Sequence, residues 1–176
     1  GPNSRSPYAD RGDTVRDPTR ARELLTQATT LARREGESAD VEVERLLREA
    51  LAADLYCGPA HNNLGALHLR RGRVYDAAEE FEWARKLMPG HPDPRVNLAL
   101  VLERAGKTEE ALSAYDAALA AYDNYLPALQ GRARLQIAAG RTDRATIDAL
   151  DEIALRGDPA WREWARLWRI KLTEER

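Results

Sequence analysis

The chain has 176 residues, of which 43% are apolar, and this is enough for one folded domain with an interior core. Its 27 basic and 29 acidic residues leave a formal net charge of −2. This balance excludes a general nucleic-acid or acidic-membrane surface, which needs clustered positive charge. The single cysteine, Cys57, excludes an internal disulfide and a multi-thiolate metal site.

Residues 1–16 are polar and carry no periodic apolar face, so we expect a flexible leader there. Gly1-Pro2-Asn3-Ser4 resembles a protease scar, and we therefore expect the natural protein to extend further at this end. Arg11-Gly12-Asp13 spells a cell-adhesion tripeptide, which we interpret as part of a polar tail because three-letter matches arise by chance. No apolar run approaches the roughly 18 residues of a membrane helix, so we expect no membrane insertion.

Two helices are predicted after the leader. Asp17-Pro18 supplies a capping carboxylate and a first-turn proline, and the helix that follows should stop near Gly36. A second helix is expected over residues 40–54, where apolar residues recur at helical spacing. The two form a first, divergent repeat.

Residues 58–89 read as two helices joined by a turn. Gly65 lets a neighbouring helix approach closely, and Gly72 can take the positive φ that a tight turn between helices needs. Proline at position 89 ends the second helix. Such a pair exposes one apolar side and needs a neighbour to cover it.

The same unit recurs along the chain at a spacing of 34 residues, so that Gly72 maps onto Gly106 and then onto Gly140. The fourth copy is weaker, because Arg132 stands where earlier copies have Leu64 and Leu98. The expected organisation is a repeat region over residues 17–157, with repeats at about 21–57, 58–91, 92–125 and 126–157.

These residues carry a resemblance to the tetratricopeptide repeat (TPR) family, whose pattern is Trp-x2-Leu-Gly-x2-Tyr, then Ala-x3-Phe, then Pro. Here the pattern reads His61-x2-Leu64-Gly65-x2-His68, then Ala77-x3-Phe81, then Pro89, with histidines in both aromatic positions. The resemblance covers roughly residues 21 to 157. It implies an all-α, right-handed superhelical solenoid of about four helix-turn-helix repeats.

The chain ends in a predicted capping helix within residues 158–176, opened by Asp158-Pro159. Three tryptophans lie on one stripe of this helix, namely Trp161, Trp164 and Trp168. We interpret the stripe as a lid over the last repeat, because terminal repeats of a stack need a cap. Three tryptophans exceed what a cap needs, so a contact between two copies of the chain is the alternative.

Catalysis and cofactor binding are not expected. His61 and His68 sit in packing positions about 10 Å apart along one helix, too far to bind one small ion together. His91 lies in a turn. No glycine-rich phosphate loop follows a strand, and Cys57 has no activating neighbour in sequence. We therefore expect no catalytic residue, no metal and no cofactor.

A binding surface is expected on the first helix of each repeat, which the TPR resemblance places on the hollow side. Two ladders recur one period apart: Asn63 with Asn97, and Arg70 with Arg104. An amide can pair with a peptide backbone, and an arginine can hold a carboxylate with two hydrogen bonds. The candidate groove residues are Asn62, Asn63, Leu69, Arg70, Asn97, Leu100, Arg104, Gln130 and Arg134.

The hypothesis is a non-catalytic protein-interaction scaffold that binds a peptide segment or helix in this groove. TPR domains that clamp a terminal carboxylate carry basic residues where this chain has Pro127 and Gly131, so a chaperone-tail clamp is not favoured. One alternative is a structural component of a bacterial envelope complex, such as a pilus or secretion-type TPR lipoprotein, self-associating through the tryptophan helix. Another is the regulatory segment of a longer enzyme. Cytoplasm and periplasm both stay open as locations.

Overall fold

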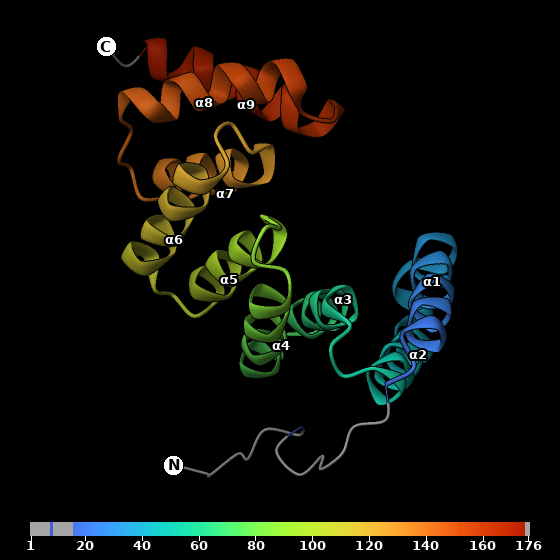
Figure 1. Cartoon of the computed structure of the whole chain (residues 1–176). Helices are drawn as coiled ribbons and strands as arrows, with labels where there is room; N and C mark the ends of the chain where they lie inside the picture. Colours follow the sequence, from blue (N-terminus) through green and yellow to red (C-terminus); the bar gives the residue numbers. More distant parts are fainter. Residues whose placement is uncertain (1–7, 9–15, 175–176) are drawn as a thin grey trace. The chain divides into compact units, whose positions relative to one another are not determined.

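The computed structural model describes Tyr8 and residues 16–174, and these residues form α-helices, one short 3-10 turn and connecting loops, with no strand among them. The leader that we expect to be flexible and the Arg11-Gly12-Asp13 tripeptide fall outside the described residues, apart from Tyr8 and Arg16. Two compact units make up the chain, residues 1–94 (unit 1) and 95–176 (unit 2). The predicted all-α helical-repeat fold is confirmed (Figure 1). The predicted repeat boundaries stay a prediction.

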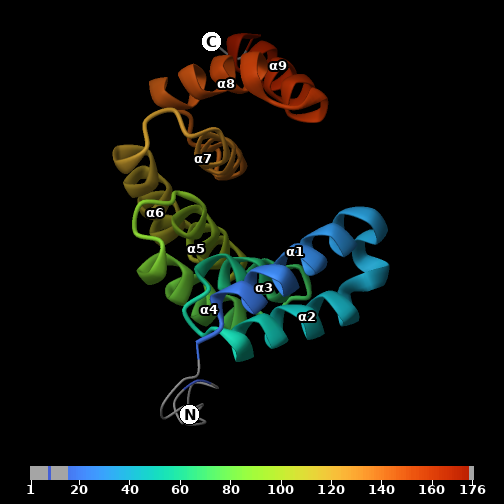
Figure 2. The same ribbon diagram turned by 45° about the vertical axis from the view of Figure 1, so that its right-hand side comes forward.

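Unit 1 contains two helix pairs. α1 (Pro18–Glu35) packs along α2 (Asp40–Ala53), and the 3-10 turn Gly36–Ala39 joins them. α3 (Gly58–Arg70) packs along α4 (Val74–Leu87), and α2 also contacts α3 (Figure 2). The Asp17 side chain accepts a hydrogen bond from the Arg20 N–H at 2.9 Å, which is the cap that the sequence predicts for α1.

Unit 2 continues the alternation of helices and turns. α5 (Asp93–Arg104) begins two residues before the unit boundary and is followed by α6 (Thr108–Ala121) and α7 (Leu126–Ala138). α8 (Arg144–Arg156) and α9 (Pro159–Glu174) then run side by side (Figure 1). The α6–α7 and α7–α8 pairs are also in contact.

The turn glycines behave as the repeat spacing predicts. Gly72, Gly106 and Gly140 have φ angles of 75°, 74° and 65°. Residues with a Cβ rarely adopt this left-handed conformation, so glycine at these positions lets each helix reverse into its partner without strain.

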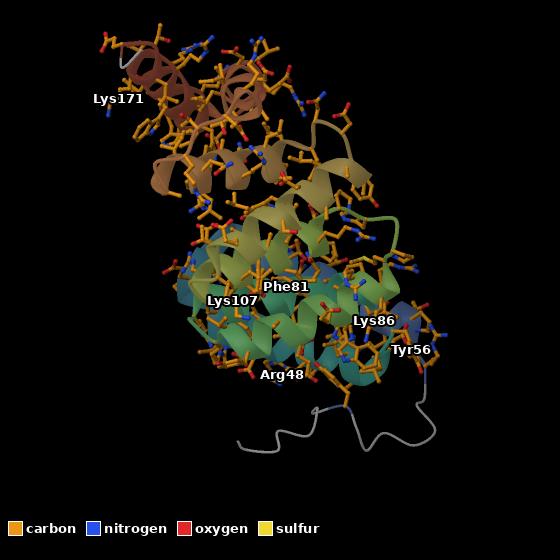
Figure 3. The ribbon with its side chains drawn as sticks, turned by 90° about the vertical axis from the view of Figure 1, so that its left-hand side faces the viewer. Arg48, Tyr56, Phe81, Lys86, Lys107 and Lys171 are labelled. Atoms are coloured by element: carbon orange, nitrogen blue, oxygen red, sulfur yellow. The ribbon has the colours of Figure 1, made fainter. Side chains whose placement is uncertain are left out.

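Each unit has its own interior. In unit 1, side chains of α1, α2 and α3 form one apolar cluster, and Phe81 of α4 is fully buried, whereas Arg48 and Tyr56 are exposed (Figure 3). Unit 2 has one cluster from α5, α6 and α7 and another from α7, α8 and α9. Helix faces that are apolar on one side are therefore covered by the next helix within each unit.

Candidate functional site

A small hollow of about 150 Å³ opens between α1, α2 and α3 of unit 1. Its floor and walls are mostly apolar, with one amide and one guanidinium among them. The lining residues are Ala28, Thr29, Ala32, Val43, Leu47, Asn63, Ala66, Leu67 and Arg70.

Small residues at helical spacing create this hollow. Ala28 and Ala32 are four residues apart on α1, so their methyl groups lie on one face of that helix. Ala66 holds the corresponding place on α3, between Asn63 and Arg70. Larger side chains at these three alanines would fill the space, so the sequence keeps the hollow open.

Arg70 is held at the end of the hollow by an ion pair. Its guanidinium hydrogen-bonds to Asp40, the first residue of α2, and Arg71 lies 3.4 Å from the other oxygen of the same carboxylate. Asp40 is only 7% exposed, so its charge is compensated by these two arginines. Because a guanidinium has five N–H donors, Arg70 keeps donors for a ligand while Asp40 fixes its position.

Of the other residues predicted for this groove in unit 1, Asn62 lies half-buried on α3, and Leu69 is 9% exposed and belongs to the core. The structure therefore brings Asn63 and Arg70 to the hollow. Leu69 instead contributes to packing. Leu69 and Arg70 are adjacent on α3, so their side chains point about 100° apart. The sequence does not say which of the two directions faces the hollow, because that depends on how α1 and α2 pack against α3.

In unit 2, the structure joins α5 to α7 through Arg134. Its guanidinium donates two hydrogen bonds to Glu103, at 2.5 and 2.9 Å. The Tyr115 hydroxyl donates to the same carboxylate at 3.2 Å. Burial, and after it the negative charge of Glu103, raises the pKa of Tyr115 well above its usual range, so the hydroxyl stays a donor.

The remaining predicted residues of unit 2 are less enclosed. Arg104 is exposed at the end of α5, whereas Asn97 and Leu100 are half-buried on the same helix. Gln130 is half-buried on α7. A mostly apolar hollow of about 270 Å³ lies beside Arg134 and is lined by Arg134, Ala160, Trp161 and Trp164.

The tryptophans of α9 are half-buried against the cluster formed with α7 and α8. Trp161 and Trp164 meet edge to face at 5.1 Å, and the Lys171 ammonium lies 4.8 Å from the Trp168 ring centre. Leu167 and Ile170 on the same helix are 51% and 57% exposed. α9 thus covers the α7–α8 pair and still presents aliphatic side chains to solvent.

His61 and His68 have the packing positions that their spacing predicts, since His61 is fully buried and His68 is 2% exposed. Burial, followed by the charge of Arg73, lowers the pKa of the His68 imidazole. Among the residues that the structure describes, no group of three His, Cys, Asp or Glu side chains is arranged to hold a metal ion. Within the same residues, no helix is long and apolar enough to cross a membrane.

Helix pairs that recur every 34 residues and are joined by left-handed glycines are typical of tetratricopeptide repeat proteins. The chain belongs to the protein kinase G tetratricopeptide repeat family, whose sequence profile matches residues 61–160, more than half of its length. A comparison with curated protein sequences gave no significant match.

Solved structures with the same fold support this assignment. An O-GlcNAc transferase mutant from Thermobaculum terrenum is 27% identical with a TM-score of 0.70, over 83% of this chain and 28% of that chain. PilF from Pseudomonas aeruginosa is 21% identical with a TM-score of 0.69, over 90% of this chain and 71% of that one. The first TPR of Spaghetti (RPAP3), bound to the HSP90 peptide SRMEEVD, is 18% identical with a TM-score of 0.64, over 73% and 99% of the two chains.

The fold and the family make this chain a protein-interaction scaffold in the general sense of TPR proteins. TPR repeats are generally non-catalytic. The transferase is a much longer protein, of which the chain spans little more than a quarter, so its activity is a property of that protein.

Proposed function

We propose that the chain binds a peptide segment in the hollow between α1, α2 and α3, with Asn63 and Arg70 as its polar contacts. The observation that carries the proposal is the composition of the hollow, where an alanine-lined apolar floor lies beside one amide and one guanidinium. Binding sites for peptides and small ligands commonly combine an apolar surface with few well-placed polar groups.

The hollow favours a particular ligand chemistry. About 150 Å³ fits one aliphatic side chain of modest size, and Asn63 offers both a donor and an acceptor to the adjacent backbone. Arg70 supplies donors for a carboxylate at one end. The preferred ligand is therefore a short segment with an aliphatic residue next to an acidic one. The peptide bound to the Spaghetti TPR, SRMEEVD, has both kinds of residue.

The residues predicted in unit 2 make a second candidate surface in the same proposal. Asn97, Leu100, Arg104 and Gln130 lie on α5 and α7, and Arg134 joins these two helices through Glu103. Because Glu103 already takes two hydrogen bonds from Arg134, we expect this arginine to contribute less to an acidic ligand than Arg70 does.

The test uses isothermal titration calorimetry with SRMEEVD and with a set of heptapeptides that vary its aliphatic and acidic positions. For the tightest peptide, Ala66→Trp should abolish binding by filling the hollow, and Asn63→Ala should weaken it about five- to tenfold through the loss of one hydrogen bond. Ala52→Trp is the matched control, because Ala52 is exposed on α2 and does not line the hollow. Affinities within twofold of the unmodified chain for both Ala66→Trp and Asn63→Ala would contradict the proposal.

A second candidate function is self-association through α9, as expected of an assembly component. The specific observation in its favour is the exposure of Leu167 and Ile170 next to the three tryptophans. Light scattering of the unmodified chain and of the Leu167→Lys variant tests this: a dimer that the substitution converts to a monomer supports it, and a monomer in both cases contradicts it.

A further inference from the structure

A second polar site lies in unit 1, built from residues that the peptide hollow does not use. Its walls are His61 of α3 with Glu80 and Trp83 of α4, and Tyr8 occupies it from a position ten residues before the start of α1. We call the space bounded by His61, Glu80 and Trp83 the aromatic slot.

His61 is held by two hydrogen bonds and by a stacking contact. Its Nδ1 lies 2.6 Å from Glu80 Oε2, and its Nε2 lies 2.8 Å from the carbonyl oxygen of Leu55. The ring stacks on Trp83 with centres 5.2 Å apart and an interplanar angle of 9°. With both nitrogens hydrogen-bonded and one face covered, this fully buried ring forms a rigid wall of the slot.

Both the ring and the hydroxyl of Tyr8 contact residues of the slot. Its ring meets the His61 ring edge to face at 5.4 Å and the Trp83 ring at 5.7 Å. Its hydroxyl donates a hydrogen bond to Glu80 Oε1 at 2.5 Å. The phenol therefore reaches the carboxylate oxygen that His61 does not contact.

Glu80 makes the slot selective for a side chain that carries a neutral hydroxyl group. The residue is only 3% exposed, and its two carboxylate oxygens contact His61 and Tyr8 respectively. A buried carboxylate oxygen without a donor is costly, so a neutral hydroxyl fits here better than an apolar ring edge. Burial and the neighbouring Glu80 raise the pKa of Tyr8 well above its usual range, so its hydroxyl keeps its proton and remains a donor.

The slot also explains an unusual feature of the repeat. TPR repeats resembling this one have aromatic residues where the chain carries His61 and His68. In this structure, Trp83 from the second helix and Tyr8 from outside the repeat supply aromatic rings around His61.

We propose that the aromatic slot is a binding site for an unmodified tyrosine side chain, and that its occupant is Tyr8 of the same chain. The site is separate from the proposed peptide hollow, since no residue of the slot lines that hollow. The slot accepts the planar ring edge to face against the stacked rings of His61 and Trp83, and it requires the hydroxyl for Glu80. A phosphate on the hydroxyl is excluded, because it would bring additional negative charge against the Glu80 carboxylate.

The experiment removes the Tyr8 side chain from the slot in the full chain and then adds a tyrosine-containing peptide to the solution. The Tyr8→Ala variant is titrated calorimetrically with a synthetic peptide of residues 1–16, in three forms that carry tyrosine, phenylalanine or phosphotyrosine at position 8. The tyrosine form should bind saturably, the phenylalanine form at least about fivefold more weakly, and the phosphotyrosine form should not bind. The unmodified chain should bind the tyrosine form far more weakly than the variant, because its own Tyr8 competes at a high effective concentration.

Controls separate the slot from non-specific binding. Tyr75→Ala is the matched variant, since Tyr75 lies on α4 but is 92% exposed, and this variant should behave like the unmodified chain. Nuclear magnetic resonance of the full chain adds a second readout, in which the His61 ring N–H signals should shift in Tyr8→Ala and stay unchanged in Tyr75→Ala. Lack of binding to Tyr8→Ala, equal binding to the unmodified chain, or unchanged His61 signals would each overturn the proposal. Tighter binding of the phosphotyrosine form would overturn the selectivity assigned to Glu80.

Discussion

Phe81 in unit 1 and Tyr115 in unit 2 occupy the same place in successive repeats, yet their rings make different contacts with the neighbouring helices. Both rings are fully buried. A Cβ added at Gly65 would lie 2.7 Å from the Phe81 ring, which places the close contact inside the α3–α4 pair. A Cβ added at Gly131 would lie 2.4 Å from the Tyr115 ring, so there the close contact joins α6 to the following helix α7.

The buried hydroxyl of Tyr115 needs a hydrogen-bond partner, which the ring of Phe81 does not. It donates to Glu103, which also accepts from Arg134, so unit 2 surrounds its ring with a polar network. The fourth repeat shows the same tendency: Arg132 replaces the buried leucine of position 64 and pairs with Asp116 and Asp143. Unit 1 thus relies on apolar contact at these positions, and unit 2 links helices through ion pairs.

The largest effect is expected from Phe81→Ala. Deleting a fully buried aromatic ring leaves a cavity between α3 and α4 and should lower the free energy of unfolding by about 3–5 kcal/mol. Urea unfolding followed by circular dichroism measures the loss, and hydrogen exchange assigns it to unit 1. A loss below about 1 kcal/mol would contradict the packing described for this ring.

Intermediate effects are expected from Gly65→Ala and Gly131→Ala. In an exposed helix such a change stabilises by up to about 1 kcal/mol, but here the added methyl group meets a buried ring, so we expect a net loss of about 1–3 kcal/mol at each site. The same unfolding assay checks both variants. Gly90→Ala serves as the control, since nothing lies within 4 Å of its added Cβ and its φ is not positive, and it should be nearly neutral.

The smallest effect at neutral pH is expected from Arg132→Leu, which restores the residue type of the earlier repeats. Arg132 is largely buried, but its partners Asp116 and Asp143 are about half exposed and stay solvated without it, so we expect a change below about 1 kcal/mol in either direction.

Arg132→Leu should differ from the unmodified chain more in its loss of stability in acid than in its stability at neutral pH. In the folded chain, hydrogen bonding from Arg132 holds the pKa of Asp143 well below its usual 3.8. The stabilisation from this pair is therefore complete above pH 3.8 and is lost as the pH falls toward the lowered pKa. Unfolding at pH 7 and pH 3 should show a smaller acid loss for Arg132→Leu than for the unmodified chain. The exposed Arg144→Leu should keep the full acid loss.

Much of the fold follows from the sequence because spacing and turn chemistry are local. The 34-residue period and the glycines at 72, 106 and 140 predict the helix pairs and the left-handed turns that the structure contains. Asp17-Pro18 and Asp158-Pro159 predict the starts of α1 and α9 to within a residue. Each of these signals depends on residues within one or two helical turns.

The site is less predictable, because side-chain partners come from distant positions. Spacing suggests Arg70 and Arg134 as groove residues, but it does not reveal that Asp40 and Glu103 pair with them across 30 and 31 positions. The sequence does not predict the contact between Tyr8 and Glu80 either, because the two are far apart in the chain and Tyr8 lies in a polar stretch without periodicity. Trp83 is the one signal of this site that the sequence offers, because a tryptophan in a helix pair usually buries much of its large ring against neighbouring side chains.

The distribution of tryptophans gives the two units separate optical reporters. Trp83 is the one indole of residues 1–94, and it stacks on an imidazole, whereas the other three belong to α9. Replacing those three with phenylalanine would leave a chain whose tryptophan fluorescence arises from Trp83 alone. Its emission would then follow the loosening of the α3–α4 pair during unfolding, and the reverse substitution, Trp83→Phe, would make the same instrument follow α9.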